Sequence, residues 1–287
     1  MPLEISLTTV KNILTRSSGF LQGCTSHSLQ PYRGCSFGAA LCGVGCYVQH
    51  NRHLLGGRAW GGFLEIRRNA AESYHLNFDR ESRWAHRQGM RFSIFCSSVT
   101  DPFVPQEFQH RITRSVLEAM LDRPPDELVV QTHSHRAAEY LPIFRELAGR
   151  CDFRVQVSIE TDMLRLPGLP PHASPITRRF EACAALRAAG IRTVVTVAPL
   201  LPIANPVQFF ARIAEVADAV VLDHFIEGDG SPTGSRTFRT PLPSAVSQID
   251  PVACTLAYRD EMVAIARQYL PGRVGVNVAG FAGHYQA

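Results

Sequence analysis

The stretch PYRGCSFGAALCGVGCY, residues 31–47, places Cys35, Cys42 and Cys46 together in one short loop. Glycine and alanine fill much of the space between them, and the stretch carries no charge after Arg33. Glycine lets a backbone take positive φ and approach a compact group closely, and thiolates are preferred ligands of soft metals. The loop therefore predicts a metal centre held by cysteine.

The number of thiols leaves two kinds of metal site open. A structural zinc site has four ligands, so it needs one more side chain, and His50 or His53 could complete a Cys3His set. Three thiolates alone leave one metal position free for a substrate or a cofactor. That is the arrangement of a catalytic iron-sulfur cluster.

Composition is ordinary for a soluble globular enzyme, with 45% hydrophobic and 19% charged residues among 287. No apolar run approaches the roughly 18 residues of a membrane helix, and the N-terminus lacks the pattern of a secretory signal. We therefore expect a cytoplasmic protein without membrane contact, in which clustered cysteines bind metal or do chemistry. The formal net charge of +4 permits an anionic partner but does not require one.

After the cysteine loop, short apolar or β-branched runs alternate with helical patterns. Residues 106–121 and 176–189 carry apolar side chains at helical spacing. The runs that predict buried strands are 91–95, 127–132, 153–159, 192–198, 219–225 and 273–279. This alternation indicates parallel βα units in an α/β fold, wound as an open sheet or closed as a barrel.

One domain, residues 1–287, accounts for the whole pattern. Residues 26–34 can serve as the first strand, so that the cysteine loop follows its carboxyl end. Residues 226–249 are rich in Gly, Ser, Pro and Thr and predict a long loop over one face of the molecule.

Polar residues gather where the predicted strands end. In parallel βα folds ligands bind at the carboxyl ends of the strands, where loops approach without disturbing the sheet. Any one of these residues alone is better explained as a cap or loop residue, but together they predict a site. They are Cys96, Ser97, Ser98, Thr100, Asp101, Thr132, His133, Ser134, His135, Ser158, Glu160, Thr161, Pro199, Asp223 and His224.

Several separate motifs, in order along residues 27–225, resemble the radical S-adenosylmethionine enzymes of the spore photoproduct lyase and DNA repair photolyase group. They are PYRGCSFGAALCGVGCY, SSVTDPFVPQE, ITRSVLEAM, VQVSIET and SPITRRFEACAALRAAGIRTVVTVAPLLP. The remaining residues, 226–287, then form a C-terminal extension.

The resemblance implies a partial (β/α)6 barrel, similar to a TIM barrel, in which Cys35, Cys42 and Cys46 hold a 4Fe-4S cluster. S-adenosylmethionine (AdoMet) would bind the fourth iron and be cleaved to methionine and a 5'-deoxyadenosyl radical that abstracts hydrogen from a substrate. One departure is the spacing C-x6-C-x3-C, where the family has C-x3-C-x2-C. The second is Gly45, which stands where the family has an aromatic residue. Glycine cannot stack on adenine, so part of the cofactor contact must come from elsewhere.

The same resemblance implies roles for individual residues. Ser98, Thr100, Asp101, Ser158 and Glu160 become candidates for AdoMet binding. At the third strand end the family often has a lysine, and this chain has His133 in its place. Cys96 would return a hydrogen atom to the substrate radical with the help of Tyr47, or would only fill the core.

The substrate and the partners stay open from the sequence. A pyrimidine photoproduct in DNA is one possible substrate, and a flavodoxin or ferredoxin is the expected kind of electron donor. The alternative is a zinc-stabilised βα binding protein without radical chemistry, which explains the cysteines but not the motifs at the strand ends.

Overall fold

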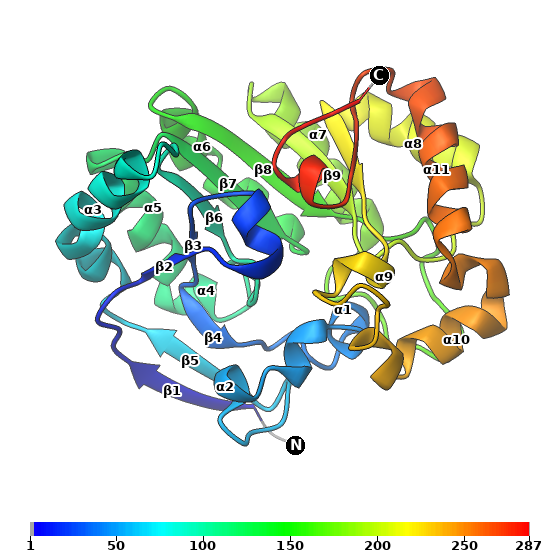
Figure 1. Ribbon diagram of the computed structural model, residues 1–287, viewed down its shortest axis with the longest axis horizontal. Coiled ribbons are helices and arrows are strands. Elements are labelled where there is room, and N and C mark those ends of the chain that lie inside the picture. Colours follow the sequence, from blue (N-terminus) through cyan, green and yellow to red (C-terminus); the bar gives the residue numbers. More distant parts are fainter. Residues whose placement is uncertain (1–2, 287) are drawn as a thin grey trace.

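The computed structural model describes residues 3–286 and is built around one large mixed sheet (Figure 1). Seven neighbouring strands run parallel, and β2 pairs antiparallel with β3 at one edge. The sheet order is β11 (Val274–Val276), β10 (Ala219–Leu222), β9 (Arg192–Val197), β8 (Asp152–Ser158), β7 (Glu127–Thr132), β6 (Ser93–Cys96), β3 (His27–Leu29) and β2 (Leu14–Arg16). The carboxyl ends of all the parallel strands therefore lie side by side along one end of the sheet, which we call its carboxyl edge.

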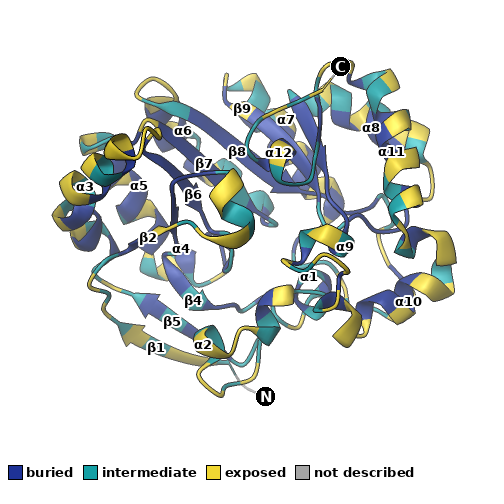
Figure 2. Cartoon of the chain, viewed as in Figure 1, coloured by how far each residue is buried: buried dark blue, intermediate teal, exposed yellow. Residues whose placement is uncertain are grey.

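The six apolar runs after the cysteine loop are all strands of this sheet, which confirms the predicted α/β class. Most residues of β6 to β10 are buried, as strands covered on both faces require (Figure 2). The last run is shorter than predicted, because residues 277–281 turn into a helix.

The predicted first strand, 26–34, is wrong as one element. The chain forms β3 in the large sheet and then β4 (Tyr32–Gly34) in a separate small sheet. Pro31 lies between them and has no N–H to continue the ladder. The cysteine loop therefore follows β4. In the small sheet β5 (Phe63–Arg67) lies between β4, which is antiparallel to it, and β1 (Glu4–Thr8), which is parallel.

Helices follow most of the strands, as a parallel sheet requires. The predicted helix 106–121 is split at Arg111, which has a φ of 55°, into α4 (Glu107–His110) and α5 (Ile112–Asp122). The prediction for 176–189 is confirmed by α7 (Ile176–Ala188). Other helices are α3 (Ala70–Arg87), α6 (Leu141–Ala148), α8 (Pro206–Val216) and α11 (Leu256–Tyr269), with shorter α1 (Leu41–Val44) and α2 (Arg52–Leu55). Within residues 3–286, none of the helices has the length and apolarity to cross a membrane.

Residues 226–249 are only partly the predicted loop. The chain first makes a turn, α9 (Phe225–Gly228), then an irregular stretch with a 3-10 turn, η4 (Thr237–Arg239). The rest is a regular helix, α10 (Leu242–Ile249), whose inner residues are buried. Proline at the start of α10 is compatible with its first turn, so the Pro and Ser content misled the prediction there.

The concave face of the sheet is covered by segments from both ends of the chain. The 3-10 helix η1 (Gly19–Gly23) and the helix α12 (Asn277–Phe281) contact each other in front of the strands (Figure 1, dark blue and red). The rings of Phe20 and Phe281 meet edge to face, with centroids 5.5 Å apart. Phe281 packs in a small core on this face, which is distinct from the main core under the outer helices.

Candidate active site

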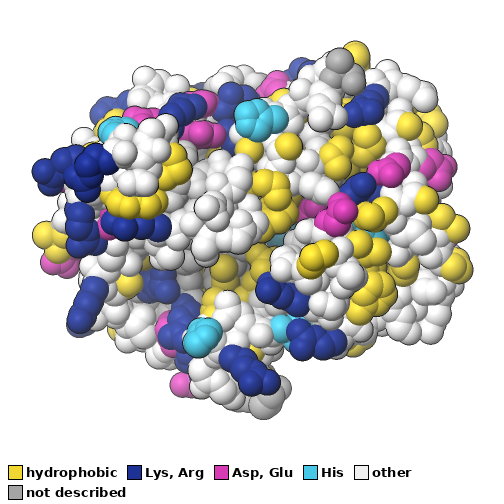
Figure 3. All heavy atoms as spheres, in the orientation of Figure 1, with side chains coloured by type: hydrophobic (Ala, Val, Ile, Leu, Met, Phe, Trp, Pro, Cys, Tyr) yellow, Lys and Arg dark blue, Asp and Glu magenta, His cyan; other side chains and the backbone are white. Residues whose placement is uncertain are grey.

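A cavity of about 190 Å³ lies at the carboxyl edge of the parallel strands. Residues that follow β6, β7, β9 and β10 form one wall, and the cysteine loop, the segment after β10 and the two terminal segments form the others. Figure 3 shows the corresponding hollow near the centre of this face, with hydrophobic side chains inside it. The predicted site edge and the cavity therefore coincide.

The three loop thiols all line this cavity. Cys35 is buried, and Cys42 and Cys46 are largely buried. Burial raises the pKa of Cys35 to about 12 and that of Cys46 to about 11. Backbone N–H groups offset part of this effect, from Phe37 and Asp101 on the first thiol and from residues 48 and 49 on the other. Such donors favour the thiolate over the thiol, and the thiolate is the form that binds metal.

The thiols do not surround one ion. Within residues 3–286 no three His, Cys, Asp or Glu side chains come close enough together to hold a single metal ion. His50 and His53, the possible fourth ligands of a zinc site, do not line the cavity. The chain at His53 is held by another contact, away from the cavity wall, since its backbone carbonyl accepts a hydrogen bond from the side chain of Arg33.

The unusual cysteine spacing has a structural explanation. Residues 35–41 fold into successive tight turns, in which the N–H of Gly38 bonds the carbonyl of Cys35. The extra residues are thereby taken up within the loop. At Gly45, an added Cβ would overlap Cδ2 of Leu242, which is 1% exposed. Helix α10, which the sequence analysis missed, thus fills the space where a side chain at position 45 would stand.

The end of β6 brings Ser98, Thr100 and Asp101, which we predict to bind AdoMet, to the cavity. Their polar atoms are already engaged within the protein. Asp101 accepts hydrogen bonds from the hydroxyl of Thr132 and from the N–H groups of Phe103 and His133. The hydroxyl of Thr100 donates to the carbonyl before Cys35 at 2.5 Å, and that of Ser98 accepts from Gln30. These residues fix the strand end against the cysteine loop.

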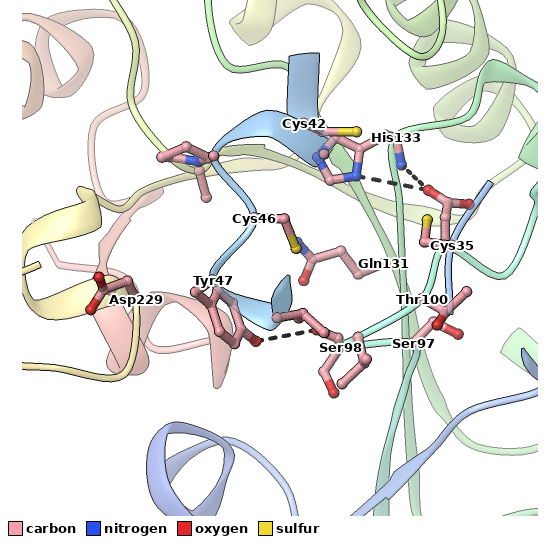
Figure 4. Close-up of a pocket in the computed structure, with 18 of the residues that line it drawn as sticks. Cys35, Cys42, Cys46, Tyr47, Ser97, Ser98, Thr100, Gln131, His133 and Asp229 are labelled. Atoms are coloured by element: carbon pink, nitrogen blue, oxygen red, sulfur yellow. Dashed lines mark hydrogen bonds and ion pairs between the residues drawn. The ribbon is translucent and has the colours of Figure 1, made fainter. Parts of the chain in front are cut away.

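His133 forms the charged centre of the site (Figure 4). Its ring lies 3.0 Å from Glu160 and 3.8 Å from Asp101. Burial opposes its charge, but the two carboxylates prevail and raise its pKa to about 9. Glu160 is also paired with the buried Arg179 at 2.8 Å, and despite its own burial Arg179 and His133 hold its pKa well below the usual range. The cluster is therefore an ionic network at neutral pH.

The other predicted AdoMet contacts lie behind the cavity wall. Ser158 is fully buried and shares a hydrogen bond of 3.0 Å with Thr196. Glu160 is 2% exposed and reaches the cavity only through His133, which does line it. The structure thus places both next to the site without a surface of their own in it.

Cys96 and Tyr47, the two predicted catalytic residues, are placed differently. Cys96 is fully buried in the main core with Ile94 and does not line the cavity. The backbone does kink, at Ser97 with a φ of 76°, but the kink turns Ser97 and not the thiol into the cavity. Tyr47 lines the cavity and donates a hydrogen bond to the carbonyl of Ser98 at 3.3 Å (Figure 4).

Several residues in or behind the cavity wall were not singled out from the sequence. Trp60 precedes β5, so nothing in the sequence links it to the cysteines. Arg179 sits in a helical pattern that resembles a solvated face, yet it is 1% exposed. Asp229 and Thr237 come from the stretch predicted as a loop. Asp223 was a strand-end candidate, and only the structure shows that it lines the cavity.

Comparisons with known proteins identify the fold. No protein-family model and no curated protein matches the chain. A solved double mutant of spore photoproduct lyase, with bound AdoMet and dinucleoside spore photoproduct, is similar with a TM-score of 0.64 at 14% identity, over 96% of this chain and 81% of that chain. A single mutant of the same enzyme gives 0.63 at 14% identity, over 95% and 81%. The chain therefore has the fold of spore photoproduct lyase.

Proposed function

We propose that the chain is a radical AdoMet enzyme that binds a 4Fe-4S cluster through Cys35, Cys42 and Cys46. One observation carries the proposal: these three thiols line a single cavity at the carboxyl edge of a parallel sheet. In this reading, β3 and β6 to β10 are the six strands of the expected partial barrel. The fold likeness to spore photoproduct lyase supports this reading.

The residues present fit the cluster better than they fit zinc. A tetrahedral zinc ion with Zn–S bonds of about 2.3 Å holds its sulfurs about 3.8 Å apart. A 4Fe-4S cluster assigns each thiolate to a different iron, so it accepts thiols that are more widely spread. The absence of a single-ion group among residues 3–286 agrees with the latter arrangement. When bound, the cluster and AdoMet supply the electron and the radical that start the reaction.

The ionic network around His133 is our candidate receptor for the methionine part of AdoMet. That part carries one ammonium and one carboxylate group, and the network offers both signs of charge in one place. His133 faces the cavity, with Asp101 beside it and Glu160 and Arg179 behind. The chain's own contribution is then to orient the cofactor and to exclude water, which a cavity lined largely by apolar side chains favours.

A nucleic acid is our candidate substrate class, with a pyrimidine photoproduct as the reacting group. A spore photoproduct lyase structure contains a dinucleoside spore photoproduct, which gives the starting point. Basic and histidine side chains gather below the central hollow in Figure 3. The charge of Arg236 acts on Tyr47, which lines the cavity, and the charges of Arg236 and Arg239 both act on His50. Such a rim would favour a phosphodiester backbone beside the cavity. A flavodoxin or ferredoxin remains the proposed electron donor.

Anaerobic reconstitution tests the proposal. The protein should bind four irons per chain and convert AdoMet to 5'-deoxyadenosine and methionine with a chemical reductant. Single changes of Cys35, Cys42 or Cys46 to Ala should abolish both, because a cluster with three thiolate ligands has no spare one.

Cys24→Ala is the matched control. Its thiol contacts the carbonyls of Phe20 and Val278 and does not line the cavity, so iron binding should persist. If the protein takes up zinc stoichiometrically and leaves AdoMet intact, the proposed function is wrong.

A further inference from the structure

Asp223 is a buried carboxylate that lines the cavity, and the ionic network around His133 leaves it out. It follows β10 directly and is 6% exposed. Its backbone is held firmly, since its N–H donates to the carbonyl of Val197 and its own carbonyl accepts from Leu200. The position of the side chain is thus set by the edge of the sheet.

One oxygen of this carboxylate lacks a hydrogen-bond donor among the described residues, while the backbone N–H of His224 acts on the group. Oδ1 is buried and accepts no hydrogen bond from any residue in 3–286. The charge of Arg259 acts on it, but that guanidinium is already paired with Glu227 and Asp260, each at 2.9 Å. Burial raises the pKa of Asp223 to about 7, against the opposing charge of Arg259. A buried acceptor without a donor is unfavourable, and such groups in native structures call for an explanation.

The surrounding chain makes room for this carboxylate. Gly228 also lines the cavity, and a Cβ there would overlap Oδ2 of Asp223 and lie 2.7 Å from its Cγ. Nearby cavity residues include the aromatic or apolar Phe225, Pro199 and Phe281, and also Asp229, whose carboxylate already accepts hydrogen bonds from residues 231 and 237. A ligand group that reaches Asp223 therefore meets flat apolar walls and an acceptor oxygen that has no donor within residues 3–286.

The place of Asp223 in the sheet separates it from the proposed cofactor receptor. His133 follows β7, and β10 lies three strands further along. At about 4.8 Å per strand this is about 14 Å along the sheet. The group that meets Asp223 is thus not the methionine part of AdoMet.

We infer that Asp223 anchors the substrate by accepting a hydrogen bond from a neutral, planar donor, of the kind offered by the imide N–H of a pyrimidine ring. The inference rests on the proposed function and names the substrate group that Asp223 would hold. The apolar walls suit a ring, and the carboxylate excludes a phosphate from this end of the cavity. Formation of the bond would satisfy Oδ1 and favour the bound state.

Binding of dinucleoside spore photoproduct to the reconstituted protein with AdoMet tests the inference. Asp223→Leu removes the acceptor, and we expect the affinity for this probe to fall about tenfold to a hundredfold. Asp223→Asn keeps a carbonyl acceptor and should lose only a few-fold. Asp122→Leu is the control, because that side chain is 74% exposed at the end of α5. AdoMet affinity should be the same in all four proteins.

The midpoint of urea unfolding is a second readout, because a purely structural role and a ligand-binding role of Asp223 predict opposite shifts in it. Removal of a buried carboxylate with an unpartnered oxygen should raise the unfolding midpoint of both Asp223 variants, as is common where stability is sacrificed for a site. A lower midpoint would mean that Asp223 supports the fold, and the inference would be wrong.

The remaining outcomes each decide the matter. Equal probe affinity in wild type and Asp223→Leu overturns the anchor, and so does a loss of AdoMet affinity with unchanged probe affinity. A wild type that cleaves AdoMet but does not bind the probe overturns the imide assignment while the proposed function stands. A wild type that binds the probe through Asp223 but leaves AdoMet intact refutes the proposed function and keeps the anchor.

Discussion

The contact between Gly45 and Leu242 yields a stability prediction that can be worked out from the structure. A Cβ at position 45 would overlap Cδ2 of Leu242 and lie 3.2 Å and 3.3 Å from its Cγ and Cβ. The backbone of Gly45 has a φ of −88°, which any residue can adopt, so packing alone sets the cost. Leu242 is 1% exposed and has little room to move. Gly45→Ala should therefore lower the free energy of unfolding by about 1 to 3 kcal/mol.

A double-mutant cycle isolates this contact. Leu242→Ala alone should cost about 2 to 5 kcal/mol, because it leaves a cavity in the core. In the double variant the methyl group added at position 45 enters that cavity, so the two costs should fall short of additivity by about 1 to 3 kcal/mol. Urea unfolding of the metal-free protein under reducing conditions measures all four proteins.

Gly149→Ala is the matched control for the cycle. Gly149 has a φ of −82°, and an added Cβ would come no closer than 3.5 Å to any atom. This change should be neutral or stabilise the protein by up to about 1 kcal/mol. Additive costs at positions 45 and 242, or a Gly45→Ala protein as stable as Gly149→Ala, would refute the packing of α10 on the cysteine loop.

The remaining predictions concern residues around the cavity. Cys96→Ala should keep the iron and AdoMet cleavage and leave the distribution of products unchanged, because the thiol lies in the core; side products detected by mass spectrometry would restore its role as hydrogen donor. For His133 the folded pKa of about 9 exceeds the unfolded value near 6.5, so its contribution to stability is full below pH 6.5 and is lost as the pH rises through 9. Urea midpoints from pH 6 to 10 should therefore fall less steeply in His133→Gln than in wild type. Glu107→Ala should lower the free energy of unfolding by about 2 to 4 kcal/mol and weaken iron retention, because Glu107 accepts hydrogen bonds from Tyr140 and from Tyr32, which lies beside the cysteine loop. Tyr32→Phe should have a smaller effect on both, and iron content after gel filtration measures the retention.

The strands of the large sheet could be predicted because their signal is local. A buried strand between two helical layers is a short apolar run, and six such runs stand between helical patterns in this sequence. The first strand could not be predicted in the same way. Residues 26–34 look continuous, but Pro31 sends the chain from one sheet to the other, and which sheet each half joins depends on residues 4–8 and 63–67, far away in sequence.

The site was predictable at its strand ends and not between them. The thiols and residues 98–101 carry chemistry in their own sequence context. The roles of Arg179 and Leu242 could not be predicted, because each depends on a residue that is distant in sequence: Arg179 pairs with Glu160, and Leu242 packs against Gly45. Cys96 shows the limit of periodicity, because the kink that could have exposed it occurs one residue later, at Ser97.

The cover that both chain ends provide on the concave face has a consequence for the order of events during synthesis. The cysteine loop is complete once residue 46 has been made, but the cavity has no floor until Phe281 follows, 235 residues later by subtraction of the two numbers. At about 5 to 20 residues per second, translation of that interval takes roughly 10 to 50 s. During this time the strand ends that wall the cavity are still being made, so the three thiols are not yet enclosed and are accessible to iron donors and to oxidants alike. Closure by α12 then ends both kinds of access, so under the proposed function the nascent chain has one period in which the cluster is either loaded or lost.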